Sequence, residues 1–162
     1  MSACLGCGGP LPRAFLDLGA TPLANALLRP EQADRPDPKH PLAVAVCGAC
    51  HLVQLTHQVP PRDMFSQYLY FSSYSDSFLA HAGRMASELI ARLRLGASSR
   101  VLEIASNDGY LLRFFKESGT AVLGIEPAQN IAEVASQRGI PTLQKFFGPD
   151  LVTEVIASFG AA

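Results

Sequence analysis

The sequence lacks long apolar runs and has no marked excess of charge of either sign. No apolar stretch in its 162 residues approaches the roughly 20 needed to cross a bilayer, and the opening Met-Ser-Ala-Cys-Leu-Gly has neither the basic segment nor the apolar core of a signal peptide. The net charge of −1 gives no general attraction to phosphate backbones or anionic lipids. We therefore expect a cytoplasmic protein with neither a nucleic-acid nor a membrane partner.

Cysteine is scarce, but its placement is informative. The four cysteines form two Cys-x-x-Cys knuckles, Cys4 with Cys7 and Cys47 with Cys50. Two such pairs complete a four-thiolate tetrahedral shell, which suits a structural zinc ion and leaves no open position for a substrate. A c-type haem attachment at Cys-Gly-Ala-Cys-His and a dithiol redox site are alternatives, but neither explains the matching pair of knuckles. His51 could replace a thiolate, although four cysteines already suffice.

The chain divides into three parts by composition and periodicity. We expect a Pro-rich zinc-binding lobe over 1–72 with a small hairpin (42–46 and 52–56), a linking helix within 73–96, and a partial Rossmann-like domain over 97–162. The helix, 77–95, has Ser75 or Asp76 as its cap and Gly96 at its end. Its expected apolar stripe consists of Phe78, Ala82, Met85, Leu89 and Leu93. In the last part the expected strands are 101–105, 121–126 and 140–144, and the expected helices are 108–118, 128–138 and 149–159. Gly119, Gly139 and Gly160 stand at the helix ends. Strands that alternate with helices predict an α/β fold, the first half of a doubly wound parallel sheet.

Two acidic residues mark the ligand edge expected for such a sheet. Glu103 lies on the first strand and Glu126 ends the second, while the Gly-x-Gly-x-x-Gly signature of a dinucleotide cradle is absent. An acid at the end of the second strand accepts hydrogen bonds from ribose hydroxyls, and Glu103 suits a ligand with a positive end. A ribose joined to a cationic amino acid describes S-adenosylmethionine. A flavodoxin-like or NAD-type half domain is the alternative.

Both signals occur together in one known family. The matching stretches are Cys4-x-x-Cys7; Phe15-Leu16-Asp17-Leu18-Gly19 with Pro22-Leu23-Ala24-Asn25; Cys47-x-x-Cys50 with Leu52-Val53-Gln54-Leu55; Tyr70-Phe71-Ser72-Ser73-Tyr74-Ser75; and Glu103-Ile104-Ala105-Ser106-Asn107-Asp108-Gly109. The chain resembles the S-adenosylmethionine-dependent C-methyltransferases with an N-terminal zinc-binding domain, which include the nucleotide-sugar C-3-methyltransferases. The resemblance implies a class I methyltransferase fold, bound zinc and S-adenosyl-L-methionine, and a nucleotide-linked keto-deoxysugar as substrate.

The resemblance also implies roles for particular residues. Glu103, Ala105, Asn107 and Gly109 stand where the general pattern has acid-x-Gly-x-Gly-x-Gly, so only the last glycine is kept. Asn107 tolerates left-handed dihedrals, so the turn is expected to survive. The implied cofactor-binding residues are Glu103, Ala105, Asn107, Gly109, Glu126, Phe146 and Phe147; Tyr74 is the candidate catalytic contact.

Family members run to roughly twice this length. We therefore expect the main base to lie beyond Ala162, no turnover by this chain alone, and self-association through an unpaired sheet edge. A zinc-ribbon binding module and an NAD-type oxidoreductase fragment remain as alternatives.

Overall fold

The computed structural model describes residues 2–161 and divides the chain into two compact units, Met1–Met64 and Phe65–Ala162. Each unit contains one three-stranded sheet. The division differs from the expected boundary at residue 72, since residues 65–72 and the long helix fall in the second unit. Tyr68 and Ser72 hydrogen-bond there to Asn130 and Asn107, and Ala86 of the helix lies in that unit's core.

The first unit is an antiparallel sheet in the order β1-β2-β3. Its strands are β1 (Leu16–Thr21), β2 (His40–Val46) and β3 (Val53–Leu55). The hairpin expected around the second knuckle is confirmed by the pairing of β2 with β3. The bounds of β1 were not predicted. Its apolar residues alternate, but Leu16 and Leu18 are exposed, and the pairing is irregular because the register shifts between Asp17 and Ala20, where Gly19 has a φ of 75°.

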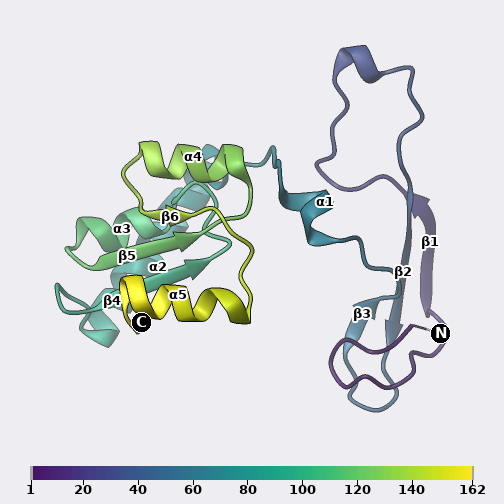
Figure 1. Ribbon diagram of the computed structural model, residues 1–162, viewed down its shortest axis with the longest axis horizontal. Coiled ribbons are helices and arrows are strands. Elements are labelled where there is room, and N and C mark those ends of the chain that lie inside the picture. The colour runs from purple at the N-terminus through teal and green to yellow at the C-terminus, as the bar shows by residue number, and fades with distance from the viewer. Residues whose placement is uncertain (1, 162) are drawn as a thin grey trace. The chain divides into compact units, whose positions relative to one another are not determined.

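This unit buries few large side chains. One hydrophobic cluster contains only Cys4, Leu11 and Cys47, and the buried positions of β2 are Ala43 and Ala45. The segment between β1 and β2 is mostly loop, as predicted, with a 3₁₀ turn, η1 (Pro30–Gln32), at its far end (Figure 1). Such a small core needs a further source of stability.

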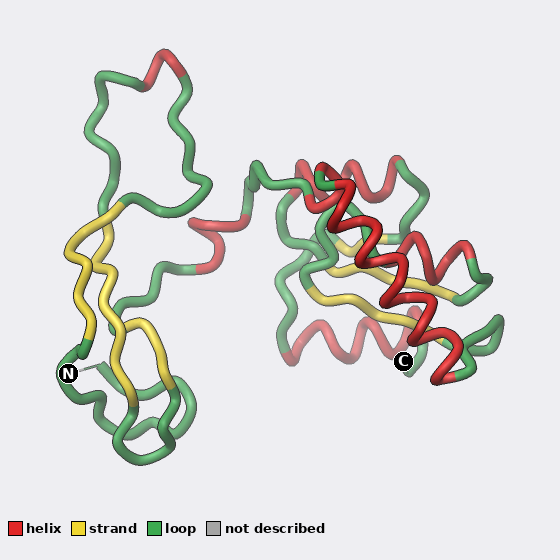
Figure 2. The backbone as a smooth tube through the Cα atoms, turned by 180° about the vertical axis from the view of Figure 1, so that it is seen from behind, coloured by secondary structure: helices red, strands yellow, loops and turns green. Residues whose placement is uncertain are grey.

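The second unit is built on a parallel sheet in the order β4-β5-β6, as predicted (Figure 1). Figure 2 shows the strands of this sheet in yellow among helices in red. Its strands and helices are α2 (Asp76–Leu93), β4 (Arg100–Ile104), α3 (Leu112–Glu117), β5 (Ala121–Ile125), α4 (Gln129–Gln137), β6 (Thr142–Leu143) and α5 (Pro149–Phe159). Before them come the short α1 (Pro61–Phe65) and η2 (Ser72–Tyr74). The predicted bounds of α5 are confirmed, whereas α3 begins four residues later than expected because residues 105–109 form a turn.

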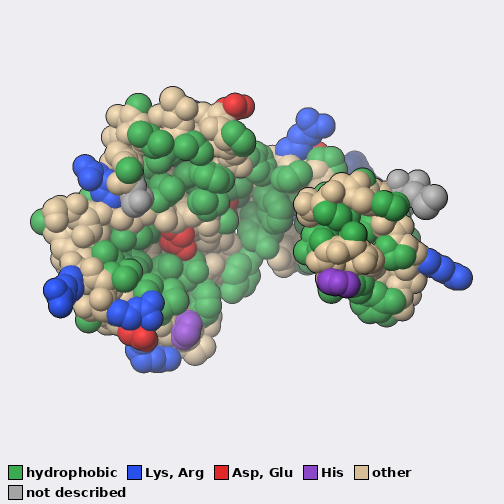
Figure 3. Space-filling model, turned by 90° about the horizontal axis from the view of Figure 1, so that it is seen from below, with side chains coloured by type: hydrophobic (Ala, Val, Ile, Leu, Met, Phe, Trp, Pro, Cys, Tyr) green, Lys and Arg blue, Asp and Glu red, His purple; other side chains and the backbone are tan. Residues whose placement is uncertain are grey.

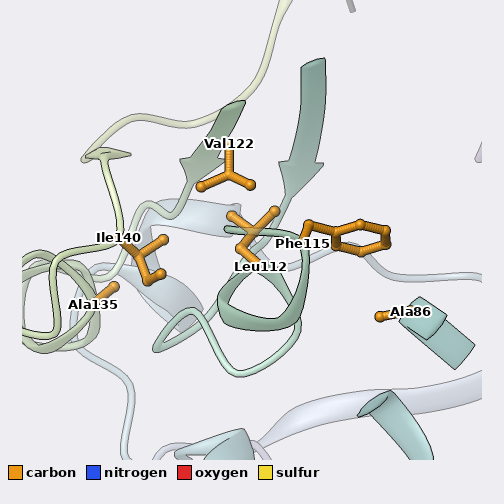
Figure 4. Packing of buried hydrophobic residues seen from close by; sticks show 6 residues of the cluster. All are labelled: Ala86, Leu112, Phe115, Val122, Ala135 and Ile140. Carbon is orange, nitrogen blue, oxygen red and sulfur yellow. The ribbon is translucent and has the colours of Figure 1, made fainter. Parts of the chain in front are cut away.

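Apolar side chains cover both faces of this parallel sheet. On one face Val122 packs with residues of α2, α3 and α4, and Figure 4 shows Leu112, Val122 and Ile140 pointing toward one another. On the other face Leu123 and Ile125 pack against α5. Because neighbouring residues of β5 serve opposite faces, the sheet is covered by helices on both sides, as a doubly wound fold requires.

The helix α2 begins as predicted and ends earlier. The Ser75 hydroxyl accepts a hydrogen bond from the Phe78 N–H, so Ser75 is the cap. The helix ends at Leu93 because Arg94 is left-handed, with a φ of 54°, so the prediction that Gly96 ends it was wrong. The expected stripe was wrong in part too. Ala82 is buried as expected, and Ala86, one turn further along the helix and outside the expected stripe, is buried too. Phe78, Met85 and Leu93 are exposed.

The glycines expected at three helix ends adopt the predicted conformation. Gly119, Gly139 and Gly160 have φ values of 85°, 78° and 88°. Among the helices of residues 2–161, none combines the length and hydropathy needed to span a membrane.

Candidate cofactor site and metal centre

The four cysteine thiols meet at one point of the first unit. All four sulfurs lie within 4.8 Å of one another. The Sγ atoms of Cys4 and Cys50 are 3.5 Å apart, and those of Cys7 and Cys47 are 3.6 Å apart. A tetrahedral zinc ion with Zn–S bonds of about 2.3 Å needs sulfurs about 3.8 Å apart. The donor set and its spacing therefore fit zinc, and His51 is outside this group.

Backbone N–H groups prepare these sulfurs for a cation. The Gly6 N–H donates to the Cys4 sulfur, and the Ala49 N–H donates to the Cys47 sulfur, both at 3.4 Å. Gln54 adds a third donor, because its Nε2 lies 3.1 Å from the Cys4 sulfur while its Oε1 accepts the Leu5 N–H.

The cysteine pKa values follow from these contacts. Hydrogen bonds from the backbone, first that of Cys7, lower the pKa of Cys4 to about 6 despite its burial. The N–H of Leu52 favours the Cys50 thiolate, yet the neighbouring sulfurs of Cys4 and Cys7 raise the pKa of Cys50 to about 12. Full deprotonation of the cluster therefore requires a divalent cation to offset the repulsion between thiolates.

The turn after β4 contains three left-handed residues at alternate positions. Ala105, Asn107 and Gly109 have φ values of 58°, 50° and 76°. The expectation that Asn107 tolerates this conformation is confirmed. Ala105 adopts it too, although a Cβ normally opposes it by about 1–2 kcal/mol. A Cβ at Gly109 would lie 2.7 Å from the Ile140 side chain, so only glycine fits the third position.

Glu126 anchors this turn from the end of β5. Its Oε2 accepts the Asn107 N–H at 3.0 Å, and its Oε1 accepts the Ala128 N–H at 2.9 Å. The side chain is buried. A carboxylate offers about four acceptor positions, so two remain after these backbone bonds.

Glu103 carries the most perturbed carboxyl of the site. Its Oε2 is buried without a hydrogen-bond partner. Burial, and then the nearby charges of Asp108 and Glu126, raise the pKa of Glu103 to about 8. Burial and then Glu103 raise the pKa of the neighbouring Tyr110 hydroxyl. A buried carboxylate with an open acceptor atom is suited to a cationic group.

A third acid, Asp108, was missed as a site residue. It is 1% exposed, and its Oδ2 lies 2.7 Å from Nη1 of Arg138 and also accepts a hydrogen bond from the Ser73 hydroxyl. Its Oδ1 is buried without a partner. Asp108, Arg138 and Ser73 line a cavity of about 430 Å³ beside α2 and α3. The sequence offers no signal for this cluster, because its members are 30 and 65 residues apart.

The predicted aromatic contacts are exposed. Phe146 and Phe147 lie in the loop after β6, at the edge of the sheet where the parallel strands end, and each is nearly half exposed. Tyr74 is 76% exposed and stacks on Phe71, with ring centroids 5.1 Å apart. These positions leave their rings accessible to a ligand.

Two comparisons with known protein sequences find similarities, one over the first unit and one over nearly the whole chain. Residues 4–65 match a family described as "Putative zinc binding domain". Over 159 residues the chain is 33% identical to C-methyltransferase NovU of Streptomyces niveus. The aligned region covers 98% of this chain and 38% of NovU. The chain thus spans well under half the length of this curated relative.

Two solved methyltransferases are similar to part of this chain. Magnesium protoporphyrin IX methyltransferase of Synechocystis, with bound SAM, has a TM-score of 0.38 at 13% identity, over 42% of this chain and 36% of that one. A SAM-dependent methyltransferase of Thiobacillus denitrificans, in complex with S-adenosyl-L-homocysteine, has a TM-score of 0.33 at 27% identity, over 51% of this chain and 32% of that one.

Fold and site together define an α/β protein in which a four-cysteine zinc-binding unit precedes a Rossmann-like unit. The resemblance to the C-methyltransferases with an N-terminal zinc-binding domain is confirmed by the match of residues 4–65 to a zinc-binding family and by the 33% identity to a C-methyltransferase.

Proposed function

We propose that this chain is the zinc- and cofactor-binding portion of an S-adenosylmethionine-dependent C-methyltransferase. The observation that carries the proposal is the unpartnered, buried carboxyl oxygen of Glu103 beside a left-handed turn and a second buried acid, Glu126. A buried carboxyl without a partner costs stability, so its retention is explained by a cationic ligand group that binds it. The similarity to a C-methyltransferase over nearly the whole chain supports the same assignment.

Different residues around the turn bind different parts of the cofactor in this proposal. Glu103 holds the ammonium of the methionine moiety, and the two remaining acceptor positions of Glu126 take the ribose hydroxyls. The turn from Ala105 to Gly109 lets the backbone approach the ligand closely, while Phe146 and Phe147 flank the adenine ring.

The cofactor supplies an electrophilic methyl group on a sulfonium centre. The protein positions the acceptor carbon in line with it and excludes water from the reacting atoms. Cys4, Cys7, Cys47 and Cys50 would hold a zinc ion with four thiolates and leave no position open, so the ion would act as a cross-link rather than as a Lewis acid.

We propose a nucleotide-linked keto-deoxysugar as the acceptor. A base would take the proton beside the ketone to give an enolate, and the enolate carbon would receive the methyl group as S-adenosylhomocysteine leaves. Tyr74 would contact the sugar or the methionine carboxylate from its exposed position. We assign the base to none of the described residues.

The proposal is tested by calorimetric titration of the zinc-loaded chain with S-adenosylmethionine. Since the pKa of Glu103 is about 8 in the free chain, binding of a cation near neutral pH should release a proton, and the measured heat should vary with the ionisation enthalpy of the buffer. Glu103→Gln should weaken binding by about 10- to 100-fold and abolish proton release.

The matched control is Glu88→Gln, which removes an exposed carboxylate from α2 and should change neither quantity. Binding that releases no proton, or that survives Glu103→Gln unchanged, would overturn the assignment of Glu103. Preference for NAD over S-adenosylmethionine would favour the oxidoreductase alternative.

No observation favours the zinc-ribbon binding module. On the face shown in Figure 3, the Lys and Arg side chains are scattered rather than gathered over one region. A nucleic-acid interface usually needs a basic patch or stripe.

A further inference from the structure

The segment of residues 66–74, here called the strap, is held to the second unit by side chains that bind its backbone. Its first attachment is Asn130 on α4. The Asn130 Oδ1 accepts the Tyr68 N–H at 3.1 Å, and its Nδ2 donates to the Tyr68 carbonyl at 2.6 Å. One amide therefore binds both polar groups of a single strap residue, as a neighbouring strand would.

The second attachment is Asn107 in the turn after β4. Its Oδ1 accepts the Ser72 N–H at 2.8 Å, and its Nδ2 donates to the Tyr70 carbonyl at 3.1 Å. The side chain is 8% exposed, so these bonds are shielded from water. The strap is thus bound at alternate residues, and a third tie follows at Ser73, whose hydroxyl contacts Asp108 and Arg138.

The strap presents its aromatic residues beside the candidate cofactor site. Tyr70 is about half exposed, and it contributes to the raised pKa of Tyr110 together with Glu103. Tyr110 in turn stacks on Phe78 of α2 with ring centroids 5.1 Å apart. Displacement of the strap would therefore move the Tyr70 side chain away from Tyr110, which interacts electrostatically with Glu103.

Asn107 belongs to the turn after β4 and also binds the strap. Its left-handed backbone shapes the turn, and its N–H is bound by Glu126, while its side chain binds the strap. A glycine would form the same turn with less strain but would lack the amide that holds the strap. The asparagine therefore supplies a connection that the conformation of the turn does not require.

We propose that Asn107 is a positioning residue that couples docking of the strap to binding of the cofactor, a proposal that rests on the proposed function. A ligand that fixes the turn fixes the Asn107 amide and thereby stabilises the docked strap. By reciprocity, a docked strap increases affinity for the ligand by the same factor.

The test is amide hydrogen exchange combined with binding of S-adenosylhomocysteine as the probe. In Asn107→Gly the Ser72 amide should exchange about tenfold faster, since two shielded hydrogen bonds to the strap are lost. The probe should slow exchange of Ser72 in the unaltered chain and not in the variant, and its affinity for the variant should fall by about three- to tenfold.

The matched control is Asn25→Gly, the same substitution at another left-handed asparagine, with a φ of 61°, in the first unit. It should alter neither Ser72 exchange nor probe affinity. Unchanged Ser72 exchange in Asn107→Gly would show that the amide does not hold the strap. Faster exchange with unchanged affinity would overturn the coupling. If the unaltered chain fails to bind the probe, the proposed function and the coupling both fail, whereas the exchange data still decide whether Asn107 holds the strap.

Discussion

At the residue scale, the turn between β4 and α3 has an alanine at one left-handed position and a glycine at another. Left-handed backbone is needed at alternate positions, and the chain uses glycine at Gly109 but alanine at Ala105. The Cβ of Ala105 is exposed and crowds only its own backbone, whereas a Cβ at Gly109 would also meet Ile140. Glycine should therefore be the more stable residue at both positions, with a larger margin over alanine at position 109.

Ala105→Gly should stabilise the second unit by up to about 1 kcal/mol. Relief of the left-handed strain, about 1–2 kcal/mol, exceeds the entropy that glycine adds to the unfolded chain, about 0.4–1 kcal/mol. Denaturant unfolding followed by circular dichroism measures the change. Ala105→Val, with a branched Cβ, should be destabilising instead; stabilisation by valine would contradict the strain at this position.

Gly109→Ala should destabilise the same unit by about 3 kcal/mol. The new Cβ would lie 2.7 Å from Ile140 and would adopt a φ of 76°. Overpacking typically costs about 1–3 kcal/mol and the conformation adds about 1–2 kcal/mol. Ile140→Ala removes the two γ carbons that the new Cβ would meet, so Gly109→Ala should cost less in that background. An equal loss in both backgrounds would show that the contact with Ile140 is not its cause.

Glu103 should make stability depend on pH. Burial first, then Asp108 and Glu126, raise the pKa of Glu103 from 4.5 to about 8, so between these values the folded chain holds a proton that the unfolded chain has released. The free energy of unfolding should therefore fall as the pH rises through this window and receive no further change from Glu103 above it. Urea unfolding at about pH 5 and about pH 9 measures the fall, which Glu103→Gln should reduce. An identical fall in the variant would assign the effect to other groups.

At the scale of elements, the two knuckles act as a cross-link for a sheet with almost no core. Cys47→Ser should unfold the first unit, since metal binding contributes about 10–16 kcal/mol in small zinc peptides, while amide signals of β4–β6 persist. Heteronuclear NMR and zinc release measure the two effects. His51→Ala should retain one bound zinc ion because four sulfurs complete the shell. Loss of zinc from the His51 variant would show that the histidine is a ligand.

Elements with strong local signals were predictable, and those set by distant partners were not. The pairing of β4 with β5 and the bounds of α5 follow from apolar runs, Pro149 and the helix-end glycines. Cys-x-x-Cys spacing predicted the four-thiol cluster. The irregular β1 and the left-handed Arg94 had no such signal. The ties of Asn107, Asn130 and Arg138 to the strap join residues 35, 62 and 65 positions apart, and a polar side chain in a sequence does not reveal its distant partner.

At the scale of the whole molecule, β4 and β6 are the two edge strands of the parallel sheet in the described residues. The strand β4 pairs with β5 on one side only, and Ile104 at its end is 51% exposed. Such an edge is a template for association with another chain.

Ile104→Lys should therefore reduce self-association at least severalfold, measured by sedimentation velocity over a range of protein concentrations. Lysine on an edge strand opposes pairing by charge and desolvation. The matched control is Ile156→Lys, which places the same charge on the exposed side of α5, where the native residue is 54% exposed. An equal reduction of self-association in both variants would show that the added charge, rather than blocked pairing through β4, is the cause.

The ties of the strap also set an order of events during synthesis. Cys50 completes the metal site early, so the first unit can fold soon after it leaves the ribosome. The strap emerges next, but Asn107, Asn130 and Arg138 follow 35, 62 and 65 residues later than the strap residues they bind. At about 5–20 residues per second, those partners arrive seconds afterwards. Leu69, Tyr70 and Phe71 therefore remain undocked in the nascent chain for that time. This apolar stretch is then accessible to a chaperone.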